Sequence, residues 1–155
     1  MIISGKNNIS DLLDEDIQNQ PAGVDLTVQK IESFKEPGTI DFDNSSRKIA
    51  QGVEHTGEKL AGGCAYRITY NEIIKVPDDA VGLIYPRSSL LRNGGHLVSA
   101  VWDPGYKGRG QGLLQVLNPH GLVVKKDARI GQIIFIRLED QPNEGYGGKF
   151  QGENM

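Results

Sequence analysis

Glycine, proline, asparagine and aspartate recur at short intervals along the sequence, and this spacing most limits what the chain can fold into. Glycine alone accounts for 20 of the 155 residues, about twice the usual share of roughly 7%. Between these turn residues, apolar and polar residues alternate, as in segments 24–28 and 66–70. A period of two is that of half-buried β-strands. The pattern predicts an all-β fold, either an antiparallel barrel or a jelly roll.

Other segments can be assigned by the same reasoning. The only helical pattern covers residues 10–18, where Ser10 can act as the N-cap and Leu12, Leu13 and Ile17 share one face. The polar segment 43–63 is expected to be a surface loop, and the length predicts a single domain over 1–155. Further strands are expected at 39–42, 80–85, 95–101, 112–117 and 132–138.

Composition excludes several classes of protein. Seventeen Lys and Arg against twenty Asp and Glu give a net charge of −3, which does not favour binding to nucleic acid. No apolar run approaches the roughly 20 residues that cross a membrane. The single cysteine, Cys64, excludes an intrachain disulfide, predicts a cytoplasmic protein, and is expected to be buried at a strand start. The three histidines have no ligand spacing, so no zinc site is expected.

A cluster of cationic and hydroxyl side chains follows the expected strand 80–85. Arg87, Ser88, Ser89 and Arg92 lie within a few residues of one another. Guanidinium groups and serine hydroxyls are donors suited to phosphate oxygens, so the segment can form an oxyanion cradle. The alternative is a polar turn whose serines cap a short helical turn.

A second motif is the turn that begins at Asp103. The sequence Asp-Pro-Gly is typical of a turn, and Tyr106 follows it. The turn displays a carboxylate that can orient a water molecule. The alternative is that Asp103 only closes an Asx turn with its own backbone. Trp102 is expected to serve packing, as are the tyrosines of segment 66–70.

The third and fourth motifs lie in the last part of the chain. Residues 129–132 read Arg-Ile-Gly-Gln and open the strand expected at 132–138. The tail 141–155 has little to bury except Tyr146 and Phe150, and glycines flank the segment that holds Lys149 and Phe150. Such a tail can be a flap in which an aromatic ring stacks on a flat ligand and the lysine amine contacts a phosphate. The alternative is a disordered end.

In this order the motifs resemble the five sequence blocks of the trimeric dUTPase and dCTP deaminase superfamily. The blocks are Ala-Gly-Val-Asp-Leu at 22–26, Pro-Arg-Ser-Ser-Leu at 86–90, Asp-Pro-Gly-Tyr-Lys-Gly at 103–108, Arg-Ile-Gly-Gln at 129–132 and the Gly-Lys-Phe-Gln tail. The resemblance covers nearly the whole chain. It implies a distorted jelly-roll β-barrel, a homotrimer with active sites at subunit interfaces, and a flexible C-terminal arm that closes over a deoxynucleoside triphosphate with Mg²⁺.

The resemblance also implies roles for individual residues. Asp103 would activate a water for attack on the α-phosphorus, and Tyr106 would support the deoxyribose. Asp25 would meet the metal through water or brace the site. The remaining residues expected to bind substrate are Arg87, Ser88, Ser89, Arg92, Gln115, Gln132, Tyr146, Lys149, Phe150 and Gln151.

One substitution separates the two branches of the superfamily. By the resemblance, a deaminase needs a glutamate where this chain has Gln115, and an amide cannot shuttle a proton as a carboxylate does. This favours an archaeal-like dUTPase that converts dUTP to dUMP and pyrophosphate. The Asp-Pro-Gly block and the Lys-Phe-Gln-Gly tail are closer to the deaminase branch.

Two alternatives to a dUTPase therefore stay open: a dCTP deaminase, alone or bifunctional, and a nucleotide-binding regulator without catalysis. No asparagine lies between Leu97 and Trp102, where many of the hydrolases place a uracil-reading amide. Base selection is therefore expected to come from main chain or from another side chain.

Overall fold

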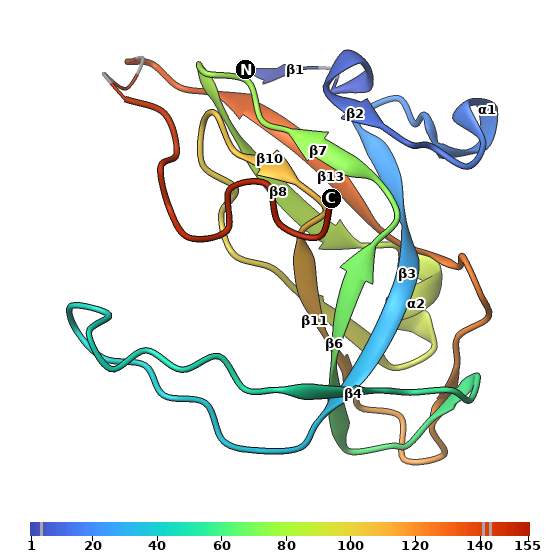
Figure 1. The fold of residues 1–155 in the computed structure, drawn as a ribbon. Coiled ribbons are helices and arrows are strands. Elements are labelled where there is room, and N and C mark those ends of the chain that lie inside the picture. The colour runs from blue at the N-terminus through green and yellow to red at the C-terminus, as the bar shows by residue number, and fades with distance from the viewer. Residues whose placement is uncertain (4, 141, 143) are drawn as a thin grey trace.

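A curled antiparallel β-sheet forms most of the molecule (Figure 1). The structure is a computed structural model that describes residues 1–3, 5–140, 142 and 144–155. Its helices are short: η1 (Lys6–Asn8), α1 (Glu15–Gln18) and α2 (Ser88–Arg92). The predicted all-β fold of jelly-roll type is confirmed.

The largest sheet has eight strands, in the order β1, β13, β3, β6, β11 and β9, with β4 added to β3 and β8 added to β13. Its strands are β1 (Ile2–Ile3), β3 (Val24–Phe34), β4 (Gly52–Glu54), β6 (Cys64–Tyr70), β8 (Ala80–Pro86), β9 (Gly95–Val98), β11 (Gln111–Val116) and β13 (Arg129–Arg137). Two small sheets complete the fold, with the strands β2 (Ile9–Ser10), β7 (Ile73–Lys75) and β10 (Lys107–Gly108) in one, and β5 (Lys59–Leu60) and β12 (Leu122–Val123) in the other.

The core lies inside the curled sheet. Tyr70, Leu114 and Phe135 are fully buried there, and Trp102 and Tyr66 are nearly so. Each such side chain stabilises the fold by about 1.5–3 kcal/mol relative to an exposed position. Tyr66 and Tyr70 therefore serve packing, as predicted, and Trp102 packs in the core but also lines a cavity.

Strand β3 is more deeply buried than its alternating sequence predicted. The polar residues Asp25 and Thr27 are each only 2% exposed, so both faces of the first half of the strand are covered. A half-buried strand was the wrong expectation here, because side chains from α1 and from the turn before β7 pack on the face that carries these polar groups.

The predicted helix over 10–18 is reduced to one turn. Ser10 belongs to β2, Asp11 has a positive φ of 59°, and the helix starts only at Glu15. Its N-cap is Asp14, which accepts a hydrogen bond from the backbone N–H of Ile17. Because Ser10 pairs as part of a strand, it cannot cap the helix, and Asp14 provides the cap instead.

Segment 39–42 is not a strand, although its composition predicted one. Only Thr39 pairs, in an isolated bridge to Lys48, and the Phe42 side chain is fully exposed. The side chain of Asp41 instead accepts hydrogen bonds from Ser45 and Ser46, which turns the chain back. This part of the chain extends away from the body as a long hairpin (Figure 1).

Two further expectations need correction. The surface loop predicted for 43–63 contains β4 and β5, because these short strands pair with β3 and β12. Cys64 does start a strand, but its side chain is exposed. The five other predicted strands, at 66–70, 80–85, 95–101, 112–117 and 132–138, are present as β6, β8, β9, β11 and β13 with shifted ends. In the part of the chain that the structure describes, no helix has the length and apolar character needed to traverse a lipid bilayer.

Candidate active site

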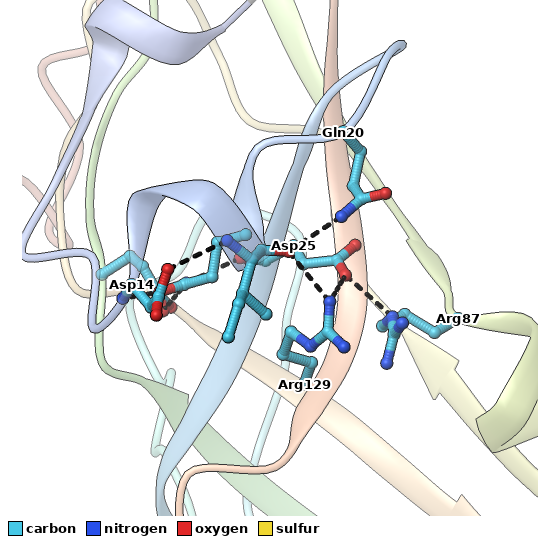
Figure 2. A network of polar contacts seen from close by, with 8 residues as sticks. Asp14, Gln20, Asp25, Arg87 and Arg129 are labelled. Carbon is cyan, nitrogen blue, oxygen red and sulfur yellow. Dashed lines mark hydrogen bonds and ion pairs between the residues drawn. The ribbon is translucent and has the colours of Figure 1, made fainter.

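A buried carboxylate joins two arginines that come from distant parts of the chain. The Asp25 carboxylate on β3 lies 2.9 Å from the Nε of Arg87 and 3.2 Å from a terminal nitrogen of Arg129. Figure 2 shows both guanidinium groups pointing at the same carboxylate oxygen. Arg129 also donates to the backbone oxygen of Ile17 in α1. Three of the five predicted blocks therefore meet at Asp25.

The ion pair leaves much of Arg87 available to a ligand. Its Nε faces Asp25, and its two terminal nitrogens donate no hydrogen bond to any residue in the described parts of the chain. Arg87 is the N-cap residue of α2, so the exposed hydroxyls of Ser88 and Ser89 follow it directly. Gln132 of β13 lies directly opposite Asp25 in the pairing with β3, whereas Arg92 is exposed at the far end of α2.

A second buried network supports the strand that carries Asp25. The fully buried Glu72 carboxylate accepts hydrogen bonds from the Gln18 amide at 2.7 Å and from the Thr27 hydroxyl at 2.6 Å. Its other oxygen accepts from the backbone N–H of Thr27 at 3.0 Å. The Gln18 amide also donates to the backbone oxygen of Asp25 at 2.9 Å. The network thus fixes α1 and the turn before β7 to the start of β3.

Burial changes the ionisation of both carboxyl groups. It raises the pKa of Asp25, and the positive charges of Arg87 and Arg129 oppose that rise. It also raises the pKa of Glu72, whose hydrogen bonds to Thr27 and Gln18 oppose the rise. Because buried charges are costly unless they are paired, the two guanidinium groups are what allow Asp25 to stay ionised.

Asp103 occupies the first position of a β-turn. Its backbone oxygen accepts from the N–H of Tyr106 at 3.2 Å, with Pro104 and Gly105 at the central positions. Gly105 has a φ of +79°, which the third position of a type II turn requires and glycine adopts without strain. The backbone therefore closes the turn. In the residues that the structure describes, nothing donates a hydrogen bond to the Asp103 carboxylate, so the alternative of an Asx turn is not what forms.

The exposed Asp103 borders an aromatic cavity of about 350 Å³. The Tyr106 ring packs edge-on against Trp102 at 5.0 Å and against Tyr146 at 5.6 Å between ring centroids. The lining residues are Ala100, Val101, Trp102, Asp103, Tyr106, Gln111, Tyr146, Phe150 and Glu153. A largely apolar cavity of this size with few polar groups is typical of a small-molecule site.

The tail packs on this cavity in the same chain. The Tyr146 N–H donates to the Pro104 oxygen at 2.7 Å, and the Gln151 side chain bridges the Lys107 N–H and the Gly105 oxygen. The Tyr106 hydroxyl donates to the Glu153 carboxylate at 2.9 Å. Burial raises the pKa of Glu153, and this hydrogen bond opposes the rise.

Other tail residues have different surroundings. Phe150 lies under the Arg47 guanidinium, 5.8 Å from the ring centroid, whereas Lys149 is exposed. Gln141 and Asn143 of the predicted arm lie outside the described residues. The tail thus brings Tyr146 and Phe150 to the wall shared with Asp103.

Gln115 lies away from this wall. It is on β11 opposite His96, and its side-chain oxygen lies 3.0 Å from the His96 Nδ1. The predicted residues therefore fall into separate groups within one chain. Asp25, Arg87 and Gln132 form one group, and Asp103 forms another with Tyr106 and the tail. Among the described residues, no hydrogen bond or ion pair joins these two groups.

The residues present do not fit a metal ion held by the protein alone. Over the described ranges, no three His, Cys, Asp or Glu side chains lie close enough to hold one. Asp25, expected to meet a metal through water or to brace the site, is nearly buried and engaged by two guanidinium groups. Its surroundings fit a brace for arginines.

Sequence reasoning missed several residues of these groups. Arg129 stood in a recognised block but received no role. Gln111 gave no signal beyond lying just before an expected strand, and Glu153 gave none. Glu72 follows Asn71 in a turn whose sequence gives no sign of burial. Its burial beside the start of β3 depends on tertiary packing alone.

Comparison with known proteins finds relatives that match nearly the whole chain. The probable deoxyuridine 5'-triphosphate nucleotidohydrolase of Methanococcoides burtonii is 39% identical over all of this chain and 94% of that protein. The deoxyuridine 5'-triphosphate nucleotidohydrolase of Methanocaldococcus jannaschii is 40% identical over 97% of this chain and 99% of that protein.

A solved structure shares the fold. The 2'-deoxycytidine 5'-triphosphate deaminase from Agrobacterium tumefaciens superposes with a TM-score of 0.62 at 24% identity, over 86% of this chain. This chain spans about half of that protein, 48% of its length. The model of the dCTP deaminase-like family matches residues 1–138. Because this model covers most of the chain, and relatives of about 40% identity cover nearly all of it, the chain belongs to the dCTP deaminase-like family.

Proposed function

We propose that this chain is a dUTP diphosphatase that forms dUMP and pyrophosphate. The observation that carries the proposal is the Asp103 carboxylate, which borders the aromatic cavity and accepts no hydrogen bond from the described residues. A carboxylate placed in this way can accept a proton from water. The relatives that share about 40% of their residues with this chain are named as deoxyuridine triphosphate nucleotidohydrolases over nearly its whole length.

In the proposed reaction, Asp103 takes a proton from a water molecule while the water oxygen attacks the α-phosphorus. The bond from the α-phosphorus to the oxygen that bridges to the β-phosphorus breaks, and pyrophosphate leaves. Tyr106 supports the deoxyribose, and Phe150 stacks on the base when the arm closes. General base assistance of this kind is typically worth about 10²–10⁴-fold in rate.

Arg87 is the principal ligand of the triphosphate in this proposal. Because Asp25 holds its Nε, the two terminal nitrogens are presented together as a fork that matches two phosphate oxygens. Ser88, Ser89, Gln132, Arg92 and Lys149 add donors and positive charge. Neutralising the phosphates reduces the repulsion that an approaching oxygen nucleophile meets.

Magnesium enters this proposal with the substrate. Mg²⁺ keeps several waters and is commonly bound through substrate phosphates, so the triphosphate supplies ligands that the described residues do not gather. For Asp25 we propose the bracing role, because two guanidinium groups contact the same one of its carboxylate oxygens.

A homotrimer with sites between subunits is part of the same proposal. The phosphate-binding group around Arg87 and the cavity beside Asp103 are not connected by polar contacts within the described chain, and a neighbouring copy can bring them together. Apolar side chains are also exposed: Ile40 is 90%, Val101 58% and Leu117 67% exposed.

A cytoplasmic location is proposed from the single cysteine.

The test of the catalytic role is Asp103→Asn. This variant keeps the side-chain shape and removes the base, so we expect bound dUTP but a turnover lowered by about 10²–10⁴-fold. Binding is measured with a non-hydrolysable dUTP analogue and turnover by pyrophosphate release. Hydrolysis by Asp103→Asn at the parental rate would refute the role.

Deamination of dCTP is the second candidate, since the family model is described as dCTP deaminase-like. Gln115 supplies an amide where that branch needs a carboxylate, but it does not line the cavity with Asp103. Product analysis with dUTP and dCTP in parallel decides between the reactions. Ammonia from dCTP would favour a deaminase, and tight binding of dUTP without pyrophosphate would favour a regulator.

A further inference from the structure

Gln111 carries a side-chain amide beside the aromatic cavity. It is the first residue of β11 and lies directly opposite Thr69 of β6. Gln111 is among the residues that line the cavity, together with Asp103 and Tyr106. Among the described residues that line the cavity, Gln111 alone has a side-chain amide, so it is the amide that this cavity can offer to a base.

The orientation of this amide is fixed by a neighbour. The Nε2 of Gln111 donates to the Thr69 hydroxyl oxygen at 3.1 Å, and Thr69 is only 3% exposed. The shielded bond turns the nitrogen toward β6. The amide oxygen and the second hydrogen of Nε2 form no hydrogen bond with a described residue, and they are left to meet a ligand.

This donor and acceptor pair distinguishes two pyrimidines. Uracil presents an N3–H donor beside carbonyl acceptors, whereas cytosine presents a bare N3 acceptor beside an amino donor. Toward uracil, the Gln111 oxygen accepts the N3–H and Nε2 donates to a neighbouring carbonyl. With cytosine, the same orientation places the Gln111 oxygen against the N3 atom, and both are acceptors. Neither then forms a hydrogen bond, and buried polar groups without a partner weaken binding.

We propose that Gln111, held by Thr69, selects uracil over cytosine in this cavity. The inference rests on the proposed function and deepens it, because it assigns the base-reading group that the sequence blocks leave unassigned. Main-chain groups can share in pairing with the base, but the side chain supplies an acceptor for N3–H that is fixed in direction.

The experiment compares kcat/KM for dUTP and dCTP by pyrophosphate release from the full chain. In Gln111→Ala we expect the ratio of kcat/KM for dUTP to kcat/KM for dCTP to fall by about 10- to 100-fold, mainly because kcat/KM for dUTP decreases. Thr69→Val keeps the shape of the threonine but frees the amide, so the ratio should fall by less. The control is Gln29→Ala, which removes an exposed glutamine of β3 and should leave the ratio unchanged.

Each result bears on one of the two claims. A parental ratio in Gln111→Ala, with dUTP still hydrolysed, would overturn the role of Gln111 and leave the proposed function standing. If the parental chain does not hydrolyse dUTP, the proposed function fails, and the base preference is read from equilibrium binding of dUMP and dCMP. In that case a selective loss of dUMP binding in Gln111→Ala supports the inference, and an equal loss of both nucleotides contradicts it.

Discussion

The Nε of Arg87 lies 2.9 Å from the carboxylate of Asp25, although 61 positions separate the two residues in the sequence. The side chain of Asp25 is 2% exposed and that of Arg87 is 29% exposed. The carboxylate is therefore inside the protein and the guanidinium reaches from it toward solvent. The Asp25 carboxylate thus orients the Arg87 guanidinium from the inner side. The terminal nitrogens on the outer side stay available to a phosphate.

Replacing Arg87 should damage substrate turnover strongly. Arg87→Ala removes the fork that faces phosphate, and we expect kcat/KM for dUTP to fall by about 10²–10³-fold. Arg87→Lys keeps the charge but cannot bind two oxygens in one plane, so it should recover only part of the loss. Arg137→Ala is the matched control, because that arginine forms an exposed pair with Asp79. Equal activity of Arg87→Ala and the control would contradict the assignment.

Asp25→Asn separates a brace from a metal ligand. The amide keeps the size of the side chain but loses the charge that holds Arg87 and Arg129. We expect kcat/KM to fall by about 10- to 100-fold, while the Mg²⁺ concentration that gives half-maximal activity stays at its parental value. A magnesium titration of both proteins measures this. A large increase in the magnesium requirement would instead identify Asp25 as part of the metal site.

Glu72→Gln should destabilise the fold. Both Glu72 oxygens accept hydrogen bonds. In the glutamine variant, the NH₂ group replaces one of these oxygens. It then faces either the Thr27 N–H or the Gln18 amide and the Thr27 hydroxyl, which donated to that oxygen. A buried donor without an acceptor costs about 1–3 kcal/mol. Urea unfolding followed by tryptophan fluorescence measures the change. Glu139→Gln, at an exposed position, serves as control, and equal stability of the two variants would show that the network is dispensable.

Docking of the tail should weaken as the pH rises. Burial raises the pKa of Glu153 above its ordinary value of 4.5, so the docked tail holds a proton that a released tail loses. Docking is therefore strongest below pH 4.5 and declines as the pH rises through the raised pKa. The rate of tryptic cleavage after Lys149, relative to that of Glu153→Gln, should increase over this range. Glu153→Gln keeps an acceptor for Tyr106 without a titrating group, and an identical pH dependence in both proteins would contradict the prediction.

Local signals in the sequence identified much of the fold. Turn residues at the ends of β8 and β11 mark where these strands stop, and Asp103, Pro104 and Gly105 form the turn that their residue types require. These features depend on backbone conformation, which nearby residues determine. The same holds for Arg87, whose position just after a strand could be inferred from the proline before it.

Features that depend on distant contacts could not be predicted in this way. Segment 39–42 has the composition of a strand but no partner strand to pair with beyond Thr39. The helix expected from Ser10 is shortened because β2 pairs with β7. The surroundings of Asp25 include Gln18, which donates to its backbone oxygen, and Arg129, which contacts its carboxylate, and no local pattern places Arg129 near it.

Strand β13 lies between β3 and β8 and pairs with both. It is the last strand among the residues that the structure describes. A nascent polypeptide that has not yet released residues 129–137 from the ribosome therefore has neither Arg129 nor a partner for the facing edges of β3 and β8. Exposed edges of this kind invite pairing between chains. Stalled or truncated translation products that end before β13 are thus the forms of this protein most prone to aggregate.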